Sequence, residues 1–125
     1  MSRLLLVRLG AGSDLVEGIE AVAREHGIRH AVVHSGPGSL MQACLEAGGP
    51  PVMTPGPAAE ILTMLGEIRE GRAVLHGSVG DPDGRIYAGR FVRGRNPVCI
   101  TVELVIETVA GATGTSPATA PATRP

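Results

Sequence analysis

The sequence predicts one small domain of the α+β or mostly β class. Its 125 residues are 43% hydrophobic and 18% charged, proportions typical of a single globular domain that buries its own core. Its 18 glycines and 10 prolines favour many turns joined by short strands over a helical bundle. Tyr87 and Phe91 are the only aromatic residues, so the core has to consist of aliphatic side chains and methionine.

The first expected elements are a strand and a helix. Residues 3–9 are almost continuously apolar and stop at a glycine-rich turn, which predicts a first strand buried on both faces. A helix is expected over about residues 13–26, with Ser13 as its N-cap and Asp14 as an acid in its first turn. Gly27 follows the last turn and is typical of a helix stop. The apolar stripe of this helix is Leu15, Ile19, Val22 and Ala23.

The middle of the chain is less regular. A second strand is expected at residues 30–34, followed by a glycine-rich turn at residues 36–40. This turn lacks the lysine of a phosphate-binding loop, so it predicts no nucleotide site. Residues 40–47 and 59–70 contain good helix formers, and propensity alone predicts helices there. The proline- and glycine-rich connection between them is of the kind that often frames a site.

The last part of the chain predicts strands. Residues 73–79 and 85–92 alternate on either side of the turn signal Asp81-Pro82-Asp83-Gly84, which predicts a β-hairpin. Asn96-Pro97 then precedes the longest strand. One face of that strand carries Val98, Ile100, Val102, Leu104 and Ile106, and the other carries Cys99, Thr101, Glu103, Val105 and Glu107.

The two ends of the chain and its cysteines indicate the bounds of the domain and the cellular location of the protein. Residues 111–125 are small, polar and proline-rich, so we expect a disordered tail after a domain of residues 1–110. The apolar run at the N-terminus is too short for a signal peptide or a membrane span, and we expect a cytoplasmic protein without membrane contact. Cys44 and Cys99 lie in apolar stretches, which is typical of buried reduced thiols, while a bridge between them stays an open alternative.

Four stretches together resemble the PPC domain, the plants and prokaryotes conserved domain. Their order and spacing match that family over residues 3–109. The resemblance implies an α+β fold in which a curved, mainly antiparallel sheet packs on one main helix. It also implies that the two helix-forming segments are strands and that the protein is a homotrimer. The four stretches are Ser13–Gly27, Ala31–Leu40, His76–Gly89 and Thr101–Ile106.

The same resemblance suggests nucleic-acid binding as a function, but the composition of the chain disfavours it. In plants such domains accompany AT-hook segments, and freestanding prokaryotic members are often labelled as DNA-binding proteins. Here Arg93-Gly94-Arg95 comes closest to an AT-hook core, but Asn96 precedes Pro97. A net charge of −1 and the scarcity of aromatic residues provide little attraction for nucleic acid. We therefore expect Arg85, Arg90, Arg93 and Arg95 to form a solvated face or intersubunit ion pairs.

Many PPC domains carry three histidines on two neighbouring strands, at positions that suit a metal ion. The matching residues in this chain are His76, Ser78 and Arg90. A serine hydroxyl is a poor ligand for zinc and a guanidinium repels a cation, so we expect no metal cofactor. A second metal hypothesis joins His30, His34 and His76. It is the weaker one, because such histidines more often form hydrogen bonds at a sheet edge or an interface.

Arg90 allows two interpretations. In the first, it forms a pocket for a small anion with His76 and Ser78, because its planar donors match a carboxylate or a phosphate. In the second, which we favour slightly, it pairs with Glu103 or with an acid of a neighbouring subunit as plain interface structure. The sequence contains no Ser-His-Asp order and no nucleophile elbow, and nothing around Cys44 activates its thiol.

Three functions remain. We expect a non-catalytic homotrimeric binding module with a regulatory role, whose pocket at a subunit interface takes a small anionic ligand or a protein partner. The second function is a small enzyme that uses His76 as an acid or base. Direct DNA binding comes third. Self-association has its own support, since Val105 and Val109 need cover that a single helix does not provide.

Overall fold

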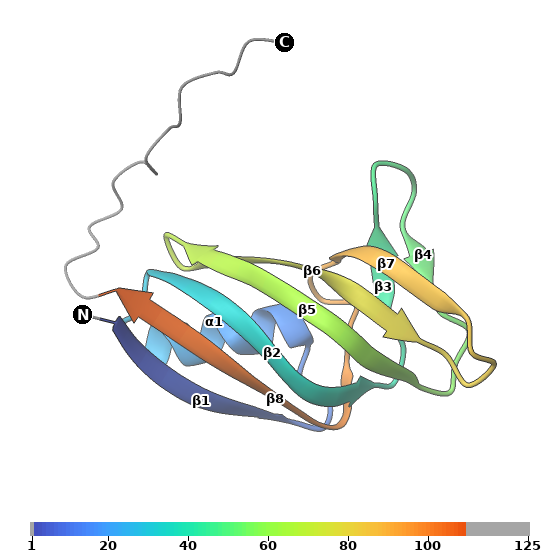
Figure 1. Cartoon of the computed structure of the whole chain (residues 1–125), viewed down its shortest axis with the longest axis horizontal. Coiled ribbons are helices and arrows are strands. Elements are labelled where there is room, and N and C mark those ends of the chain that lie inside the picture. The colour runs from blue at the N-terminus through green and yellow to red at the C-terminus, as the bar shows by residue number, and fades with distance from the viewer. Residues whose placement is uncertain (1, 110–125) are drawn as a thin grey trace, which may run out of the picture.

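The computed structural model of the chain describes residues 2–109, which form one eight-stranded antiparallel sheet and one helix (Figure 1). The predicted α+β class with a mainly antiparallel sheet is therefore confirmed, and the predicted tail at residues 111–125 lies outside the described residues. The strand order across the sheet is β1-β8-β2-β5-β6-β7-β3-β4. The elements are β1 (Ser2–Gly10), α1 (Leu15–Glu25), β2 (His30–Leu40), β3 (Cys44–Glu46), β4 (Val52–Met53), β5 (Ala59–Arg69), β6 (Arg72–Gly80), β7 (Ile86–Phe91) and β8 (Val98–Val109).

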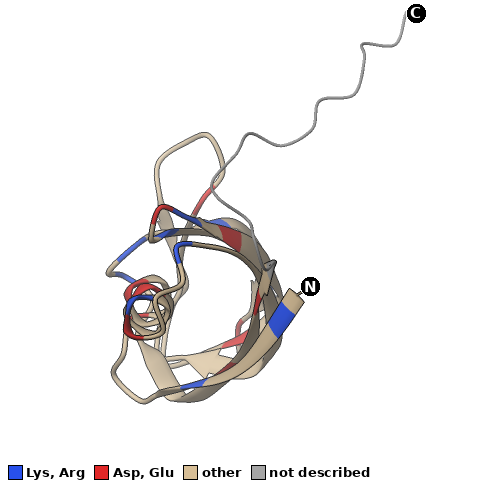
Figure 2. Cartoon of the chain, turned by 90° about the vertical axis from the view of Figure 1, so that its left-hand side faces the viewer, with Lys and Arg blue, Asp and Glu red and all other residues tan. Residues whose placement is uncertain are grey.

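The helix α1 covers one face of the sheet, and Figure 2 shows the sheet strongly curled, with the helix at the open side of the curl on the left. It begins at Leu15, two residues after the start of the predicted range, and Asp14 is its N-cap in place of Ser13. The Asp14 carboxylate accepts a hydrogen bond of 2.9 Å from the backbone N–H of Glu17, which is the acid of the first turn. Its buried side chains are Leu15, Val16, Ile19 and Ala23, all of them part of the aliphatic core. Within the described residues, no helix is long and apolar enough to cross a membrane.

Strand β1 is an edge strand, and the prediction that both of its faces are buried is wrong within the single chain. Val7 and Leu9 face the core and are each only 4% exposed. Leu4 and Leu6 point the other way and are 66% and 76% exposed. Since α1 covers only one face of the sheet, a continuous apolar run here fills the core with one half of its side chains and leaves the other half in solvent.

Strand β2 continues through the segment that the sequence predicts as a glycine-rich turn. It pairs with β8 up to Leu40, with register shifts on either side of Gly38. A Cβ on Gly36 would lie 2.7 Å from the backbone oxygen of Glu103, and one on Gly38 would lie 2.8 Å from the Cα of Val102. These glycines therefore permit a close approach between two strands, and they do not end one.

Strands β3 and β5 occupy the two segments in which propensity predicts helices, so the expectation of strands that came from the family resemblance is confirmed. Strand β5 pairs with β2 on one side and with β6 on the other. It buries Ala59, Ile61, Met64 and Ile68. Pairing on both sides outweighs an intrinsic helix preference that is worth only a few tenths of a kcal/mol per residue.

The hairpin of β6 and β7 and the long strand β8 confirm the alternation seen in the sequence, with one exception. Val98, Val102, Leu104 and Ile106 are buried as expected, but Ile100 is 71% exposed. Val98 pairs with Leu40 and Val102 with Gly38, so four steps along β8 oppose two along β2. This irregularity turns Ile100 out of the core.

Candidate functional site

The face of the sheet that points away from α1, which we call the outer face, carries most of the residues that the sequence analysis selected. One row of cross-strand partners runs over seven of the eight strands, and we call it the central row. Its aliphatic members lie towards β1 and its charged members towards β3. In spatial order the row is Leu6, Val105, His34, Leu65, His76, Arg90 and Glu46.

His76 and Arg90 are direct cross-strand partners, so the structure brings together two of the three residues of the predicted anion pocket. The guanidinium of Arg90 donates a hydrogen bond to the carboxylate of Glu46 on β3. Gly89 allows this approach, because a Cβ there would lie only 2.6 Å from the backbone oxygen of Glu46. A cavity of about 460 Å³ lies at this place, lined by Glu46, Ala47, Gly48, Gly49, His76, Gly89 and Arg90.

Ser78 does not line this cavity. It lies one row further along β6, where its partner on β7 is Ala88. Its hydroxyl is 2.7 Å from the hydroxyl of Thr63 on β5, which provides it with a hydrogen bond inside the chain. The pocket is thus built from His76 and Arg90 on two strands and from the segment that follows β3.

Glu103 is far from Arg90, and the predicted pairing between them is wrong within one chain. Strand β8 lies four positions from β7 in the sheet. The carboxylate of Glu103 instead accepts a hydrogen bond of 3.1 Å from Arg8 on β1. Sequence reasoning missed Glu46 as the partner, because its segment is predicted as helical and only the long-range pairing of β3 with β7 places it beside Arg90.

The three histidines of the weaker metal hypothesis do not come together. His34 and His76 share the central row, but Leu65 on β5 stands between them, and two inter-strand spacings separate their backbones by about 9–10 Å. His34 forms a 2.9 Å contact with Glu107. His30 pairs with Arg69 near the end of β5. Over residues 2–109, no three histidine, cysteine, aspartate or glutamate side chains are grouped as metal ligands.

The zinc site that the family resemblance implies does not fit the residues present. Of the three positions, only His76 provides an imidazole. The Ser78 hydroxyl is bound to Thr63, and the Arg90 guanidinium is permanently charged and held by Glu46. These donors would repel a divalent cation or bind it weakly, so we derive no metal chemistry for this site.

Figure 2 shows basic and acidic residues interspersed along the chain. Two arginines of the basic stretch, Arg90 and Arg93, line one cavity together with Glu46. Arg93 forms two hydrogen bonds to Glu20 of α1, and a nitrogen of Arg95 lies 3.4 Å from the sulfur of Met53. Burial raises the pKa of Glu20, but the hydrogen bonds from Arg93 and from the Ala73 N–H outweigh it and hold that pKa below its ordinary value. Two of the four arginines of this stretch, Arg90 and Arg93, are therefore balanced by acids of the same chain.

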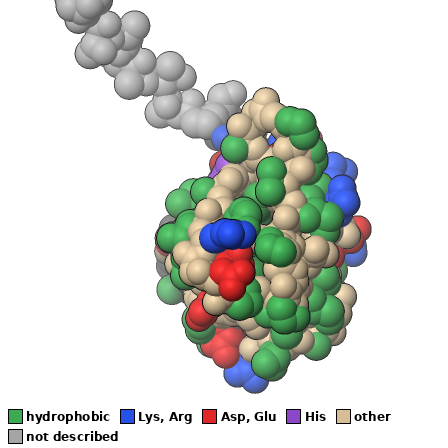
Figure 3. Space-filling model, turned by 90° about the vertical axis from the view of Figure 1, so that its right-hand side faces the viewer, with side chains coloured by type: hydrophobic (Ala, Val, Ile, Leu, Met, Phe, Trp, Pro, Cys, Tyr) green, Lys and Arg blue, Asp and Glu red, His purple; other side chains and the backbone are tan. Residues whose placement is uncertain are grey.

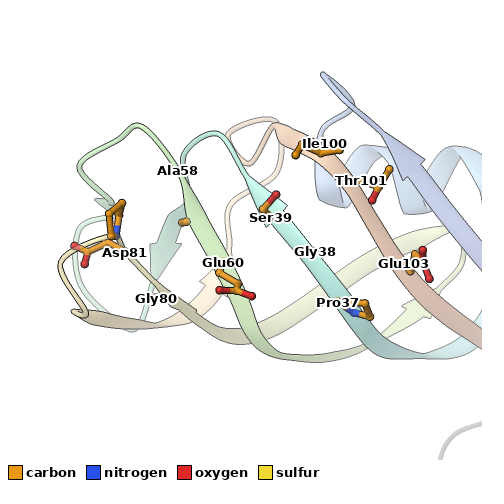
Figure 4. Close-up of a pocket in the computed structure, with 12 residues that line it drawn as sticks. Pro37, Gly38, Ser39, Ala58, Glu60, Gly80, Asp81, Ile100, Thr101 and Glu103 are labelled. Carbon is orange, nitrogen blue, oxygen red and sulfur yellow. The ribbon is translucent and has the colours of Figure 1, made fainter.

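A second cavity, of about 530 Å³, lies at the other end of the outer face and was not found from the sequence (Figure 4). Asp81 and Glu103 line it, but both are engaged within the chain. Asp81 accepts hydrogen bonds from the N–H groups of Asp83 and Arg85 and from the Tyr87 hydroxyl. Burial raises the pKa of Asp81, but these hydrogen bonds outweigh it and hold that pKa below its ordinary value. This carboxylate shapes the hairpin turn.

Both cysteines carry free thiols. Cys44 is fully buried, and its backbone N–H and C=O are both bound by the side chain of Asn96. Cys99 is half-buried on β8. The structure thus agrees with the reduced state expected from their apolar surroundings.

Three solved structures resemble this fold. A hypothetical protein from Salmonella cholerae-suis has a TM-score of 0.76 and 26% identity, over 86% of this chain and 78% of its own. A protein from Bacteroides thetaiotaomicron, whose assignment as DNA-binding is provisional, has a TM-score of 0.74 and 21% identity over 86% and 78%. A metal-containing protein from Archaeoglobus fulgidus has a TM-score of 0.68 and 23% identity over 84% and 78%. At these identities the last two show a shared fold alone.

No curated protein matches the sequence. The family model of the Plants and Prokaryotes Conserved (PCC) domain, however, matches residues 1–110, which include all the described strands and the helix. The order of elements agrees with the four stretches from which the resemblance was inferred. The chain therefore belongs to the PCC domain family.

Proposed function

We propose that this chain is a self-associating binding module, a homotrimer as in the family that it resembles, which binds its ligand or partner where the outer faces of its subunits meet. The proposal depends mainly on one observation. Five large aliphatic side chains on neighbouring rows of the outer face are between 40% and 76% exposed. We call them the outer patch, and they are Leu4, Leu6, Val32, Leu65 and Val74.

An apolar patch of this kind is unusual on a monomeric protein, because burying such side chains is worth about 1.5–3 kcal/mol each. The ion pairs around it favour a partner with a neutral surface. Four pairs lie on or beside this face, each between two groups of the same chain: Arg8–Glu103, His34–Glu107, Glu67–Arg69 and Glu46–Arg90. A second copy, whose charges are balanced in the same way, meets this requirement.

The binding site of the module is proposed at the cavity of His76 and Arg90. Because Glu46 already compensates the charge of Arg90, a small anion would have to displace this carboxylate before binding. A protein segment offers both hydrogen-bond donors and acceptors, so it can bind in the cavity without displacing the Glu46 carboxylate. We therefore place a protein partner ahead of a small anion as the occupant.

Catalysis and DNA binding rank lower. His76 has no neighbouring acid or nucleophile in its cavity other than Glu46, which is bound to Arg90. Two of the four arginines of the basic stretch, Arg90 and Arg93, are paired with acids of the same chain, which lowers the positive charge available to phosphates. Replacing His76 with alanine should abolish any turnover if the protein is an enzyme, and DNA binding should weaken steeply with salt if the second alternative holds.

The oligomeric state tests the proposal. Light scattering and native mass spectrometry of the full chain at micromolar concentration, with metal analysis of the same sample, should show three 12.8 kDa chains without stoichiometric zinc. The variant Leu65→Glu, which places a charge in the centre of the outer patch, should dissociate the assembly. The control Ile86→Glu changes a side chain of similar exposure, 68% against 65%, that lies outside the patch, and it should leave the assembly intact.

A wild-type protein that remains a single 12.8 kDa species would refute self-association. An assembly that survives Leu65→Glu would show that subunits meet elsewhere, and the outer patch would no longer be their interface. Stoichiometric zinc would contradict the expected loss of the metal site.

A further inference from the structure

An arm of the chain projects from the body of the domain beside the His76 and Arg90 cavity. It consists of residues 47–53, the connection after β3 together with β4, and Figure 1 shows it standing away from the sheet at the upper right. Every residue of the arm is exposed. Strand β4 is held to β3 by only two residue pairs, Cys44 with Met53 and Leu45 with Val52.

The base of the arm is rigidly anchored. Thr54 is 1% exposed, and its hydroxyl accepts a 2.9 Å hydrogen bond from the N–H of Ala43. The Asn96 side chain, which is fully buried, accepts a 2.8 Å hydrogen bond from the N–H of Cys44 and donates one of 3.1 Å to its C=O. The arm is therefore presented in a defined direction by buried hydrogen bonds at both of its ends.

The composition of the arm is typical of a surface that is buried in a contact between proteins. Its sequence Ala-Gly-Gly-Pro-Pro-Val-Met contains no charged side chain and no side chain with a hydroxyl or amide group. Figure 3 shows hydrophobic side chains gathered on this projection at the top of the view. Val52 and Met53 are 52% and 39% exposed. Prolines at 50 and 51 reduce the entropy that ordering a loop against a partner would cost.

The arm continues the outer face beyond the edge of the sheet. Its first residue follows Glu46, the last member of the central row, and it lines the cavity that holds His76 and Arg90. At the other end of the same row lies Leu6 of the outer patch. One chain thus presents an uncharged apolar arm at one end of the row and an apolar patch that extends from β1, at the other end, as far as β6. The charges beside this patch are balanced within the chain.

We infer that the arm of one subunit lies on the outer patch of a second copy of this chain. This inference rests on the proposed self-association and specifies its contact. In the proposed homotrimer such a contact is head-to-tail, because the arm of each subunit meets the patch of the next, and a head-to-tail contact that closes on itself forms a ring. Each subunit then provides one arm and receives one, and the cavity of His76 and Arg90 is enclosed between subunits.

Cross-linking locates the contact directly. Gly49 at the tip is a suitable position for a photoreactive phenylalanine analogue, because nothing lies within 4 Å of a Cβ added there. Irradiation of the full-length oligomer should join position 49 of one copy to peptides of another that contain Leu4, Leu6 or Leu65. Mixing isotopically light and heavy chains separates links between copies from links within one. Links confined to one copy, or to surfaces other than the outer patch, would overturn the inference.

A matched pair of substitutions measures the contribution of the arm. Val52→Glu places a charge in the proposed contact and should raise the dissociation constant of the assembly at least about tenfold. Met41→Glu makes the same change at a residue of similar exposure, 42% against 52%, outside the arm and the patch, and should leave that constant within about twofold. Thermal unfolding of both variants checks that each still folds.

The two proposals fail in different ways. If the unmodified chain is a monomer, self-association itself is wrong. If Leu65→Glu dissociates the oligomer while Val52→Glu does not, the outer patch remains the interface and only the role of the arm is refuted.

Discussion

The substitution Asn96→Ala examines the residue that joins three distant parts of the fold. Asn96 lies between β7 and β8 and is 0% exposed. Its side chain accepts one hydrogen bond, from the N–H of Cys44, and donates two, to the backbone oxygens of Cys44 and Val92, at 2.8, 3.1 and 2.9 Å. It therefore connects β3, at the base of the arm, to the end of β7.

The loss of stability depends on the hydrogen bonds that the alanine can no longer form. Removing the amide leaves the buried N–H of Cys44 without this partner, which costs about 1–3 kcal/mol. The backbone oxygens of Cys44 and Val92 lose one hydrogen bond each, worth about 0.5–1.5 kcal/mol, but keep those from the N–H groups of Val92 and Arg95. Water that enters the resulting space recovers part of this cost. We expect the free energy of unfolding to fall by about 3–5 kcal/mol, a large part of the total stability of about 5–15 kcal/mol of a typical domain.

Urea unfolding followed by circular dichroism measures this loss. The matched control is Gln42→Ala, which also removes an amide but breaks only one hydrogen bond, of 2.9 Å, to the backbone oxygen of Thr54. The control should cost about 1 kcal/mol. If Asn96→Ala lowers the free energy of unfolding by no more than the control does, the claim that this side chain holds the arm in place is refuted.

Three further predictions concern charge, metal and space. Glu20→Gln should lower the free energy of unfolding by about 1–3 kcal/mol at neutral pH. The pKa of Glu20 in the folded protein lies below its unfolded value of about 4.3, so the carboxylate stabilises the fold above that pH, and this stabilisation is lost as the pH falls further. The double variant with Ser78→His and Arg90→His should retain one zinc ion per chain after dialysis, because it restores two imidazoles beside the existing one. Gly77→Ala should cost about 1–3 kcal/mol or more, because its Cβ would lie 2.1 Å from the backbone oxygen of Thr63.

Each of these predictions has its own control. A gap in stability between wild type and Glu20→Gln that stays constant from pH 7 to pH 3 would contradict the lowered pKa. The single variant Ser78→His keeps the guanidinium and should not retain zinc, so retention by it would show that Arg90 does not block the site. Gly49→Ala, at a glycine with open space around it, should change stability by less than about 0.5 kcal/mol.

The elements whose signals lie in the local amino-acid pattern could be predicted from the sequence. The hairpin of β6 and β7 follows from two alternating runs around a strong turn signal. The apolar stripe of α1 and its glycine stop predicted the helix to within two residues at its start. In these cases the signal lies within about ten residues of the element, and tertiary contacts reinforce it.

Other elements depend on partners that are distant in the chain. The segment of β5 favours a helix by composition, and pairing with β2 and β6 makes it a strand. The glycines at 36 and 38 resemble a turn, and only the nearness of β8 shows that they serve close strand packing. The apolar run of β1 does not reveal that one of its faces is open, because burial depends on what covers the sheet.

The candidate site divides in the same way. Residue types alone determined that His76 is the one imidazole left at three family positions and that Arg90 disfavours a metal ion there. The hairpin register, readable from the turn, also places these two residues opposite each other. Only the tertiary structure decided that Glu46 and not Glu103 neutralises Arg90, and that an exposed arm stands beside them. The physical reason is that strand order in a sheet is set by the packing of the whole chain, whereas chemistry and alternation are properties of each segment.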